Sequence, residues 1–437
     1  MSVKLIKENW FMSENHVLQS MIADRRDFHA HPEEGWCEFR TTALIIKRLR
    51  ELGFEVLVGE NVINRQNALG RDEKLVAAAQ EKALASPEVD PAIIEEMKGL
   101  TGCVAILRTG KAGPISAWRF DIDALRGVTE STDSSHLPTK LGFASSVPNI
   151  MHACGHDGHA AVGLAVAKWV MKHKDGLCGT IKLIFQPAEE GVRGAAAMVA
   201  QGVVDDCDWL IGSHVGGEFV SNEVGVLTEG YLATTKMDIY FKGTPAHAGS
   251  DPEKGRSALL AACATALSIQ GLPRHSDGDS RVAVGRVEAG EGRNVVAQHG
   301  FLQVEVRGST KSVNDFLTEE VYRIVRGVSE LYGVSGEVIK VGEACRYVCD
   351  PQAVEVLLQA AQKVPGLTKV ERWTTERGSE DCSLFAERVR SRGGKAGFFD
   401  FGCKHQGHHR PDFDIEDEEA LLVAYQIFTN AIASING

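Results

Sequence analysis

The densest group of side chains able to bind a metal or move a proton lies in MHACGHDGHAAVG, residues 151–163. Thiolate, imidazole and carboxylate are ligands of zinc, and the same groups can act as nucleophile, base or acid. Cys154 and His156 are close enough in the chain to bind one ion together. The stretch is compatible with a zinc clip, a thiol site, half of a catalytic centre or a polar turn without chemistry. Its other polar members are His152, Asp157 and His159.

Further candidate ligands lie in three other places along the chain. Glu189 and Glu190 are adjacent in QPAEEG, His214 ends the run DWLIGSHV, and His408 and His409 follow a third apolar run. Five or six ligands are too many for one tetrahedral ion. They suit two ions, which would lie about 3.5–4 Å apart, clamp a hydroxide and polarise a carbonyl. If one of the adjacent glutamates binds metal, the other lies near it and can serve as a base.

Each of these residues also has a simpler interpretation. A single histidine such as His214 at a strand end is more often hydrogen-bonded than a ligand, and AEE is usually a solvated helix start. The convergence of the groups favours one shared site. Cys154 could instead be a nucleophile or redox thiol whose pKa nearby histidines lower, but this leaves Glu189, Glu190 and His214 unexplained. A structural metal site would hold four ligands at short spacing, which these residues lack.

Four apolar runs share a pattern, because each run ends in acids or histidines. They are PISAWRFDID (114–123), TIKLIFQPAEE (180–190), DWLIGSHV (208–215) and AGFFDFGCKHQGHH (396–409). Helical stretches at 158–173 and 194–204 lie between them. Near-continuous apolar strands alternating with helices predict an α/β fold with helices on both faces of the sheet. Ligands of such sheets bind beyond the carboxyl ends of the strands, where the polar groups are expected.

A middle segment with another pattern predicts an inserted α+β domain. A half-solvated strand is expected at 234–244, a helix at 257–270 and two more strands at 281–290 and 295–308. In a second helix at 312–333, Ser312 is the expected N-cap and Gly333 the C-terminal stop. The expected apolar face of that helix consists of Val313, Phe316, Leu317, Val321, Ile324, Val328 and Leu331.

The chain therefore divides into a catalytic domain formed by residues 1–232 and 343–437 and an inserted domain formed by residues 233–342. Residues 71–100 are expected to add a charged, Ala-rich helical insert to the first part of the catalytic domain. A plain surface elaboration is the simpler interpretation of this insert, and contact with a partner chain is the alternative.

The composition is that of a soluble globular protein. The chain has 437 residues, of which 43% are hydrophobic and 24% charged. Its formal net charge of −12 argues against nucleic acid as a partner. No apolar run reaches the length of a membrane span, and MSVKLIKENWFMSEN shows no secretory signal. The ten cysteines match no disulfide framework, which indicates a reduced cytoplasmic protein.

Seven motifs occur in order along nearly the whole chain. They are RRDFHAHPEEGWCEFRTT (25–42), RFDIDAL (119–125), MHACGHDGH (151–159), IFQPAEEG (184–191), GTPAHAGSDPE (243–253), GSED (378–381) and GHHRPDFDIEDE (407–418). Together they resemble the amidohydrolase branch of the dinuclear metallopeptidases, relatives of aminoacylases and glutamate carboxypeptidases. The branch includes hippurate, auxin-conjugate and p-aminobenzoyl-glutamate hydrolases. The resemblance implies a metallopeptidase-type α/β catalytic domain with an inserted lid and dimerisation domain.

The resemblance also implies two divalent metal ions per subunit, manganese or zinc. In relatives of this kind a thiolate bridges the two ions, and Cys154 matches that position. His156 and Glu190 would bind one side of the pair. His214 and His409 would complete the ligand shell. His409 is chosen over His408 because HRPDF matches the family's sequence motif around that histidine.

Other residues receive catalytic roles by the same resemblance. Glu189 would be the general base, which takes a proton from the attacking water and passes it to the leaving nitrogen. Asp123 matches an acid that supports the metal ligands, whereas Asp121 is not counted as a ligand. His408 would be a neighbour of the site, and His159 would orient other residues without binding metal.

Substrate contacts are implied for the inserted domain and the GSED motif. His247 would reach into the site of a neighbouring protomer, where it would stabilise the oxyanion. Asn294 would hold the substrate carbonyl, and Arg307 its carboxylate, for which a planar guanidinium is well suited. Gly378 and Ser379 are further expected substrate-binding residues. A surface charge is the simpler interpretation of Arg307.

The implied activity is hydrolysis of the amide between an aromatic acyl group and an acidic amino acid. The motifs look most like those of p-aminobenzoyl-glutamate hydrolases, and indole-3-acetyl-aspartate hydrolases or general N-acyl-amino-acid hydrolases are the alternatives. The implied assembly is a homodimer or a heterodimer with a homologous subunit.

Overall fold

The four apolar runs form neighbouring strands in the middle of one large mixed sheet. The computed structural model describes the chain from residue 3 to residue 437, with side chains from residue 15 onward. β6, β3, β7 and β15 run parallel, so their carboxyl ends meet at one edge, as predicted. The strands, in sheet order with β14 beside β8, are β1 (Glu55–Val58), β2 (Cys103–Arg108), β6 (Thr180–Gln186), β3 (Ile115–Asp121), β7 (Trp209–Val215), β15 (Lys395–Phe401), β8 (Glu223–Gly230), β13 (Tyr347–Val348) and β14 (Lys369–Thr375).

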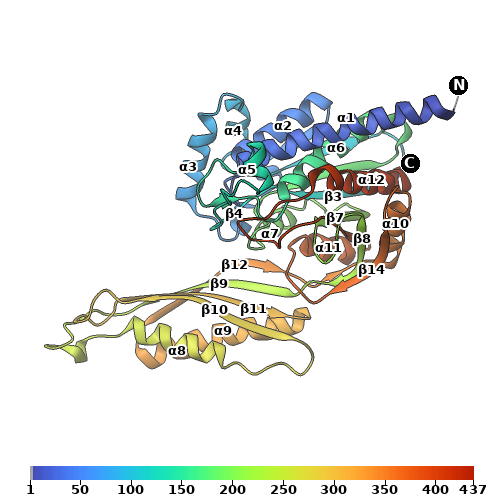
Figure 1. Cartoon of the computed structure of the whole chain (residues 1–437). Coiled ribbons are helices and arrows are strands. Elements are labelled where there is room, and N and C mark those ends of the chain that lie inside the picture. Colours follow the sequence, from blue (N-terminus) through green and yellow to red (C-terminus); the bar gives the residue numbers. More distant parts are fainter. Residues whose placement is uncertain (1–2) are drawn as a thin grey trace.

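Helices cover both faces of this sheet, which confirms the predicted α/β class (Figure 1). On one face lie α6 (His156–His173), α12 (Asp417–Asn436) and α10 (Pro351–Gln362), with α1 (Val3–Ala30) and α2 (Phe39–Leu52) packed against α6. On the other face lie α7 (Gly194–Ala200) and α11 (Cys382–Ser391). Smaller elements at the periphery are α3 (Glu73–Leu84), α4 (Pro91–Met97), α5 (Leu137–Leu141), β4 (Leu125–Arg126) and β5 (Ile150–Met151).

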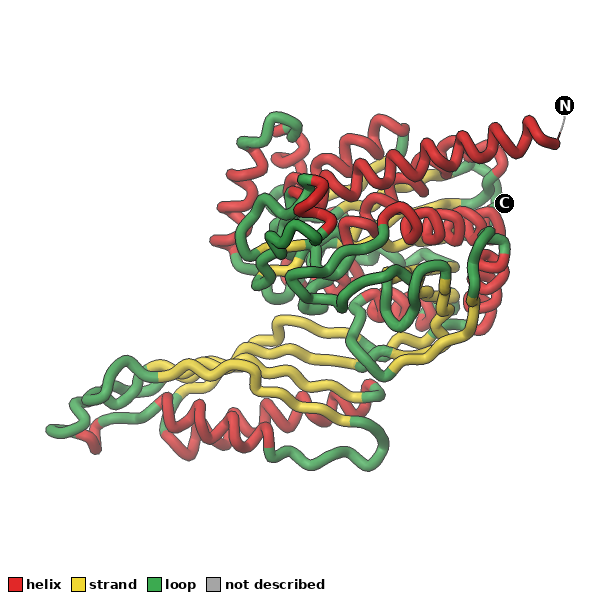
Figure 2. The backbone as a smooth tube through the Cα atoms, viewed as in Figure 1, coloured by secondary structure: helices red, strands yellow, loops and turns green. Residues whose placement is uncertain are grey.

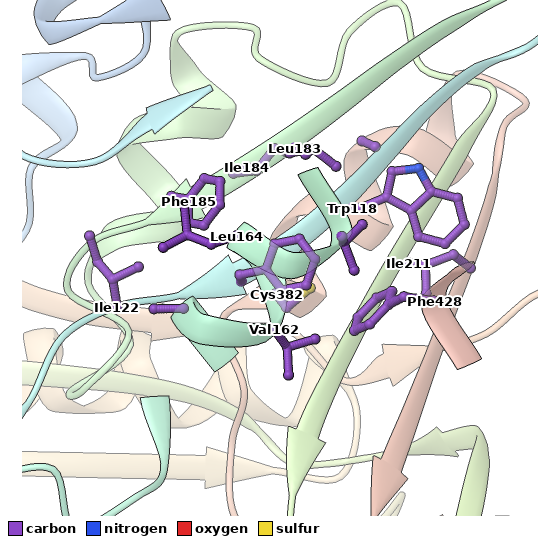
Figure 3. Close-up of a cluster of buried hydrophobic side chains, with 14 of the residues drawn as sticks. Trp118, Ile122, Val162, Leu164, Leu183, Ile184, Phe185, Ile211, Cys382 and Phe428 are labelled. Atoms are coloured by element: carbon purple, nitrogen blue, oxygen red, sulfur yellow. The ribbon is translucent and has the colours of Figure 1, made fainter. Parts of the chain in front are cut away.

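The main hydrophobic core lies between the central strands and the covering helices (Figure 3). Phe428 of α12 packs against β3, with ring centroids 6.0 Å from Trp118 and 4.9 Å from Phe120. Trp118 and Phe428 are fully buried. Burial of such a side chain contributes roughly 1.5–3 kcal/mol to stability, so this core holds the strand ends in place.

A second unit with its own core follows β8. Its sheet has the order β10 (Ser280–Ala289), β11 (His299–Gly308), β9 (Ala233–Lys242) and β12 (Ser335–Ala344). Two helices, α8 (Ala258–Gln270) and α9 (Lys311–Tyr332), cover one face, and the other face is turned toward the large sheet (Figure 2). This is the inserted α+β unit that the sequence predicts. The exact domain boundaries at residues 232 and 342 stay a prediction.

Three details of α9 differ from the sequence prediction. The N-cap is Thr310, whose hydroxyl accepts the N–H of Val313 at 3.3 Å, and Ser312 already lies inside the helix. Phe316 and Leu331 are 37% and 74% exposed, so they lie outside the buried face. Leu331 lies in the last turn of α9, where its side chain faces solvent. Gly333 ends the helix with a φ of 63°, as predicted.

Other boundaries shift by a few residues. The 71–100 insert contains the two helices α3 and α4, as expected for a helical insert. β11 begins at His299 rather than 295, and α7 ends at Ala200 rather than 204. None of the helices from residue 3 onward combines the length and apolar character that a membrane span requires.

Candidate dinuclear metal centre and active site

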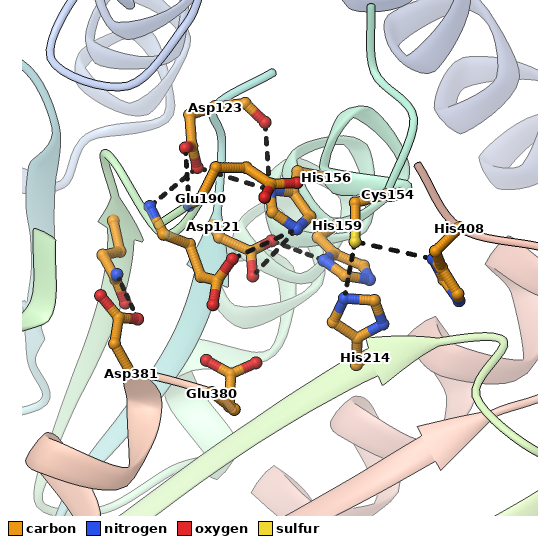
Figure 4. A network of polar contacts seen from close by, with 12 residues as sticks. Asp121, Asp123, Cys154, His156, His159, Glu190, His214, Glu380, Asp381 and His408 are labelled. Atoms are coloured by element: carbon orange, nitrogen blue, oxygen red, sulfur yellow. Dashed lines mark hydrogen bonds and ion pairs between the residues drawn. The ribbon is translucent and has the colours of Figure 1, made fainter. Parts of the chain in front are cut away.

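Side chains from several segments converge where the parallel strands end (Figure 4). Asp121 ends β3, Glu189 and Glu190 follow β6, His214 lies near the end of β7, and Cys154 precedes α6. Possible ligand atoms from these segments form several groups of three within 4.8 Å of one another. The fold therefore brings together residues that are far apart in the chain, at the sheet edge where ligands bind in this fold class.

Two of these groups share the sulfur of Cys154. One group joins Cys154 to His156 and His214, and the other joins it to Glu190 and His409. The sulfur lies 3.4 Å from Nε2 of His214. Two divalent ions held by these two groups would share the sulfur of Cys154.

In His156 and His214 a backbone carbonyl engages Nδ1, so Nε2 of each ring remains available to a metal. Nδ1 of His156 donates to the carbonyl of Asp123 at 3.0 Å, and its buried Nε2 makes no hydrogen bond with any described residue. Nδ1 of His214 donates to the carbonyl of Val215 at 2.8 Å, so the Nε2 lone pair faces Cys154. A second hydrogen bond of this kind is typical of metal-binding histidines, because it fixes the tautomer.

Both histidines of the 408–409 pair lie beside the site. Nε2 of His409 is 3.6 Å from Oε1 of Glu190, a buried oxygen that has no hydrogen-bond partner in the described chain. Nδ1 of His408 is 3.6 Å from the sulfur of Cys154. Burial lowers the pKa of His409 and, with help from neighbouring imidazoles, lowers the pKa of His408 to about 3. Both side chains are therefore neutral, the form that binds metal. The two donor groups that share Cys154, one with His156 and His214 and the other with Glu190 and His409, fit two divalent ions.

A tight turn places Cys154 directly before helix α6. Gly155 caps this helix with a φ of 93°, a left-handed conformation that glycine adopts freely. A side chain at this position would lie 2.3 Å from the side chain of Val215. The glycine therefore allows the turn to approach β7 closely enough for Cys154 to contact His214.

The loop that carries the two glutamates is held in a strained conformation. Ala188 and Val192, on either side of them, have φ values of 52° and 58°, which cost about 1–3 kcal/mol each for non-glycine residues. The carboxylate of Asp123 accepts the backbone N–H of Glu189 at 3.0 Å and that of Glu190 at 2.9 Å. Asp123 thus supports the loop and, through its carbonyl, one of the imidazoles.

Buried acids surround Glu189 on its other side. Oxygens of Glu189, Glu380 and Asp381 lie within 4.8 Å of one another. Arg119 binds both neighbours, at 2.9 Å from Glu380 and 3.1 Å from Asp381. Burial raises the pKa of Glu189 well above its ordinary range, and the two acids raise it further. A carboxylate with a raised pKa is suited to accept and return a proton.

The sequence does not predict this network of buried charges, although GSED is one of the seven motifs. Arg119 stands in the middle of an apolar strand, where a buried arginine is unexpected. Its Nη1 also pairs with Asp121 at 2.6 Å. The strand RFDID, with an arginine and two acids in an apolar run, was the available signal.

His159 connects two strands beneath the metal ligands. Its Nδ1 is 2.5 Å from Asp121, and its Nε2 accepts the backbone N–H of Val215 at 3.0 Å. The ring therefore ties β3 to β7 next to His214. This geometry agrees with the expectation that His159 orients its neighbours, although Asp121, His156 and His159 also form a possible ligand group.

A cavity of about 350 Å³ opens beside these residues and reaches the inserted unit. Its volume lies in the range of small-molecule sites. Arg307, Gly378 and Ser379 line it, together with Cys154, Glu189, Glu190, His214 and His409. Three of the four expected substrate-binding residues therefore lie in one cavity with the metal-binding donors.

His247 and Asn294 lie elsewhere, in the exposed loops at the far end of the inserted unit. The loop that follows β9 and carries His247 extends away from β7 and β15 (Figure 1). His247 pairs with Val295 through the backbone, and the carbonyl of Asn294 accepts the N–H of Ala248 at 3.0 Å. Neither residue lines the cavity of its own chain.

Known proteins match the chain along nearly its whole length. Residues 117–434 match peptidase family M20/M25/M40. A Haemophilus influenzae homolog of one of the subunits of p-aminobenzoyl-glutamate hydrolase is 41% identical, with 96% of this chain and 99% of the other covered. The indole-3-acetyl-aspartic acid hydrolase of Enterobacter agglomerans is also 41% identical, with 96% of both chains covered.

Two solved structures share the fold. The aminobenzoyl-glutamate utilization protein from Klebsiella pneumoniae is 36% identical, with a TM-score of 0.83 and 97% of each chain covered. A dinuclear metal-binding M20 peptidase from Bacillus subtilis is 25% identical, with a TM-score of 0.66 and 96% of this chain and 99% of the other covered. The matches confirm the resemblance seen in the motifs. With its dinuclear metal-binding fold, the chain is a hydrolase that belongs to peptidase family M20/M25/M40.

Proposed function

We propose that the protein cleaves the amide of p-aminobenzoyl-glutamate, giving p-aminobenzoate and glutamate. One observation carries the proposal: Cys154 is shared by two groups of metal-binding donors, beside Glu189 and in one cavity with Arg307. The names of two similar proteins add the substrate class, an aromatic acyl group joined to an acidic amino acid.

Cys154, His156, Glu190, His214 and His409 would hold two divalent ions. When bound, such ions polarise the scissile carbonyl and make water acidic enough to attack it near neutral pH. The mixture of thiolate, imidazole and carboxylate suits both zinc and manganese. We favour manganese, because the donor set includes a carboxylate oxygen and the buried acid Asp121 lies beside it.

The chain supplies the proton transfer. Glu189 takes a proton from the attacking water as its oxygen forms a bond to the amide carbon. The same carboxyl group then gives the proton to the nitrogen of glutamate as the carbon–nitrogen bond breaks. Asp123 holds the backbone of Glu189 in position for both transfers.

The inserted unit supplies substrate contacts. Arg307 pairs with a carboxylate of the substrate, and Gly378 and Ser379 line the same cavity. Asn294 and His247 act on the cavity of a second protomer, where they contact the carbonyl and the developing oxyanion. Exposure of both residues in the single chain supports this arrangement.

The second protomer is either an identical chain or a homologous one. The Haemophilus influenzae relative is named as the homolog of one particular subunit of a hydrolase, which supports a partner of a different kind. A cytoplasmic location is supported by ten free cysteines in the described chain, most of them buried.

Hydrolysis of indole-3-acetyl-aspartate is the second candidate, favoured by the 41% identity to a hydrolase of that name. A general N-acyl-amino-acid hydrolase is a broader alternative. The cysteine-nucleophile and thiol-redox alternatives gain no support, because burial raises the pKa of Cys154 and makes its thiolate less accessible without metal.

A substrate panel tests the proposal. The protein, loaded with manganese or zinc, is assayed with p-aminobenzoyl-glutamate, indole-3-acetyl-aspartate and hippurate. We expect the highest kcat/KM with p-aminobenzoyl-glutamate, and we expect a chelator to abolish the activity. Turnover that survives a chelator but not a thiol-alkylating reagent would instead establish a cysteine nucleophile.

A further inference from the structure

One cation of the cavity has no part in the reaction described so far. Lys236 lies on β9, whose alternate residues Met237 and Ile239 are buried against the helices of the inserted unit. Successive side chains of a strand point to opposite faces, so Lys236 projects from the face turned toward the large sheet. There it lines the cavity with Glu190 and His409.

The sheet register makes Lys236 a neighbour of Arg307. Lys236 stands directly opposite Glu305, and Thr234 stands opposite Arg307. The two cations are therefore diagonal neighbours on one sheet face, about 7–8 Å apart at their backbones and within reach of each other's partners. Nη2 of Arg307 lies 3.0 Å from Glu305, and Nζ of Lys236 lies 3.8 Å from the same oxygen.

This end of the cavity carries a surplus of positive charge. Among the ion pairs of the described residues, Glu305 is the acid partner of both cations, and neither has another. Their side chains are only 32% and 26% exposed, so their charges are partly shielded from water. Arg377 also lines the cavity, but it is 82% exposed and pairs with Glu218 at 3.2 Å.

The cavity also joins Lys236 to the metal-binding side. Lys236 lines the same cavity as Glu190 and His409, which are two of the proposed metal-binding residues. A substrate whose amide lies beside these residues therefore has its amino-acid part within reach of Lys236 and Arg307.

We propose that Lys236 is a specificity-determining residue, which pairs with the side-chain carboxylate of an acidic amino acid while Arg307 holds the α-carboxylate. A substrate with one carboxylate needs one of these cations, and a dicarboxylate engages both. The inference rests on the proposed function, and it adds the reason for a preference for acidic amino acids.

Glutamine provides the sharpest comparison, because it replaces the side-chain carboxylate of glutamate with a neutral amide of nearly the same shape. The kcat/KM of the wild-type protein is expected to be about 10- to 100-fold higher for p-aminobenzoyl-glutamate than for p-aminobenzoyl-glutamine. The Lys236→Met variant removes the charge and keeps much of the apolar stem. In this variant the ratio of the two kcat/KM values should fall to nearly one.

Two further variants control the experiment. Lys236→Arg keeps the positive charge and should retain most of the preference for glutamate. Lys242→Met removes a lysine from the same face of the same strand, six residues away and outside the cavity, and should keep the wild-type ratio. Metal content is measured for every variant by elemental analysis.

The outcomes separate this inference from the proposed function. If the wild-type protein cleaves both amides and Lys236→Met leaves their ratio unchanged, Lys236 does not read the side-chain carboxylate, although the hydrolase assignment stands. Loss of metal in Lys236→Met would instead assign the lysine to the metal centre and overturn the inference. If the wild-type protein cleaves neither amide, nor any other N-acyl amino acid, the proposed function itself is wrong.

Discussion

The predicted catalytic residues occupy two regions with opposite surroundings. In the metal edge, which comprises Cys154, His156, Glu189, Glu190 and His214, the side chains are buried or half-buried, and each neighbours another donor of the group. In the distal tip, which comprises His247 and Asn294, the side chains are exposed. Nδ1 of His247 accepts the backbone N–H groups of Gly249 and Ser250 in its own loop.

The difference shows which half of the site one chain can build. Buried polar groups hold their geometry because each lost partner would cost free energy in a low-dielectric interior. Exposed groups have no such constraint, so a catalytic role for the distal tip requires a second surface to complete its surroundings. Folding of one chain brings the metal edge together, and we propose that association with a second protomer completes the distal tip.

The largest effect is expected within the metal edge. Glu189→Gln removes the proposed base but keeps the size of the side chain, so kcat should fall by about 10²–10⁴-fold. Elemental analysis should still find both metal ions. Turnover close to that of the wild-type protein would contradict the assignment of the base.

Cys154→Ala tests whether the two groups of donors depend on one sulfur. We expect the variant to lose at least one of its two ions, because the proposed bridging thiolate would serve both. Cys345→Ala removes another half-buried thiol, outside the cavity, and should keep its metal. Two ions retained by Cys154→Ala would show that the sulfur does not bridge.

His247→Ala tests the distal tip. Removal of a group that stabilises an oxyanion should lower kcat by about 10²–10³-fold with no loss of metal. His299→Ala removes another exposed histidine of the inserted unit and serves as the control.

Mixing the variants sharpens the comparison further. A dimer of one Glu189→Gln chain and one His247→Ala chain contains one complete site, so refolded mixtures should regain about a quarter of the wild-type activity. No recovery in a mixture that forms dimers would place His247 in the site of its own chain.

A smaller effect is expected from the exposed apolar face of α8. Leu259, Leu260 and Leu267 are 37%, 51% and 77% exposed on this helix, a cluster typical of an association surface. Leu267→Asp should weaken the proposed dimer in sedimentation experiments. Leu331→Asp, at a similarly exposed position of α9, should not. An unchanged dimer in the Leu267→Asp variant would exclude this face.

The smallest effect concerns the inserted unit alone. Thr310→Ala removes the N-cap of α9 and should lower the free energy of unfolding by about 1 kcal/mol, measured by chemical denaturation. Ser312→Ala should have a much smaller effect, because Ser312 does not cap the helix. Metal content should be unchanged in both variants.

The sequence was most informative where one local pattern decides the structure. The apolar strands that end in Asp121 and His214 were predicted, because a buried parallel strand has a distinctive composition. Choosing Thr310 over Ser312 as N-cap depends on the φ angle at the helix start, which either residue could adopt. The exposure of Phe316 and Leu331 depends on where α9 lies on its sheet, which helical periodicity does not specify.

The buried charges were hard to predict for a different reason. The network joins residues up to 262 positions apart, and no spacing in the sequence links Arg119 and Asp121 in β3 to Glu380 and Asp381 in the GSED motif. Roles for His247 and Asn294 came from the family resemblance alone. They stay predictions, because the partner surface is not part of a single chain.

A backbone contact between the two units restricts which sequences can replace the inserted unit. The backbone N–H of Glu343, in β12, donates to the carbonyl of Val192 at 2.8 Å, two residues after Glu190. Any side chain at Gly342 would meet the carbonyl oxygen of Gly191 at 2.2 Å. A chimera that takes the inserted unit from a relative must therefore keep glycine at this junction, or the graft will displace the loop that carries Glu189 and Glu190. The unit is a separate fold but not an interchangeable module.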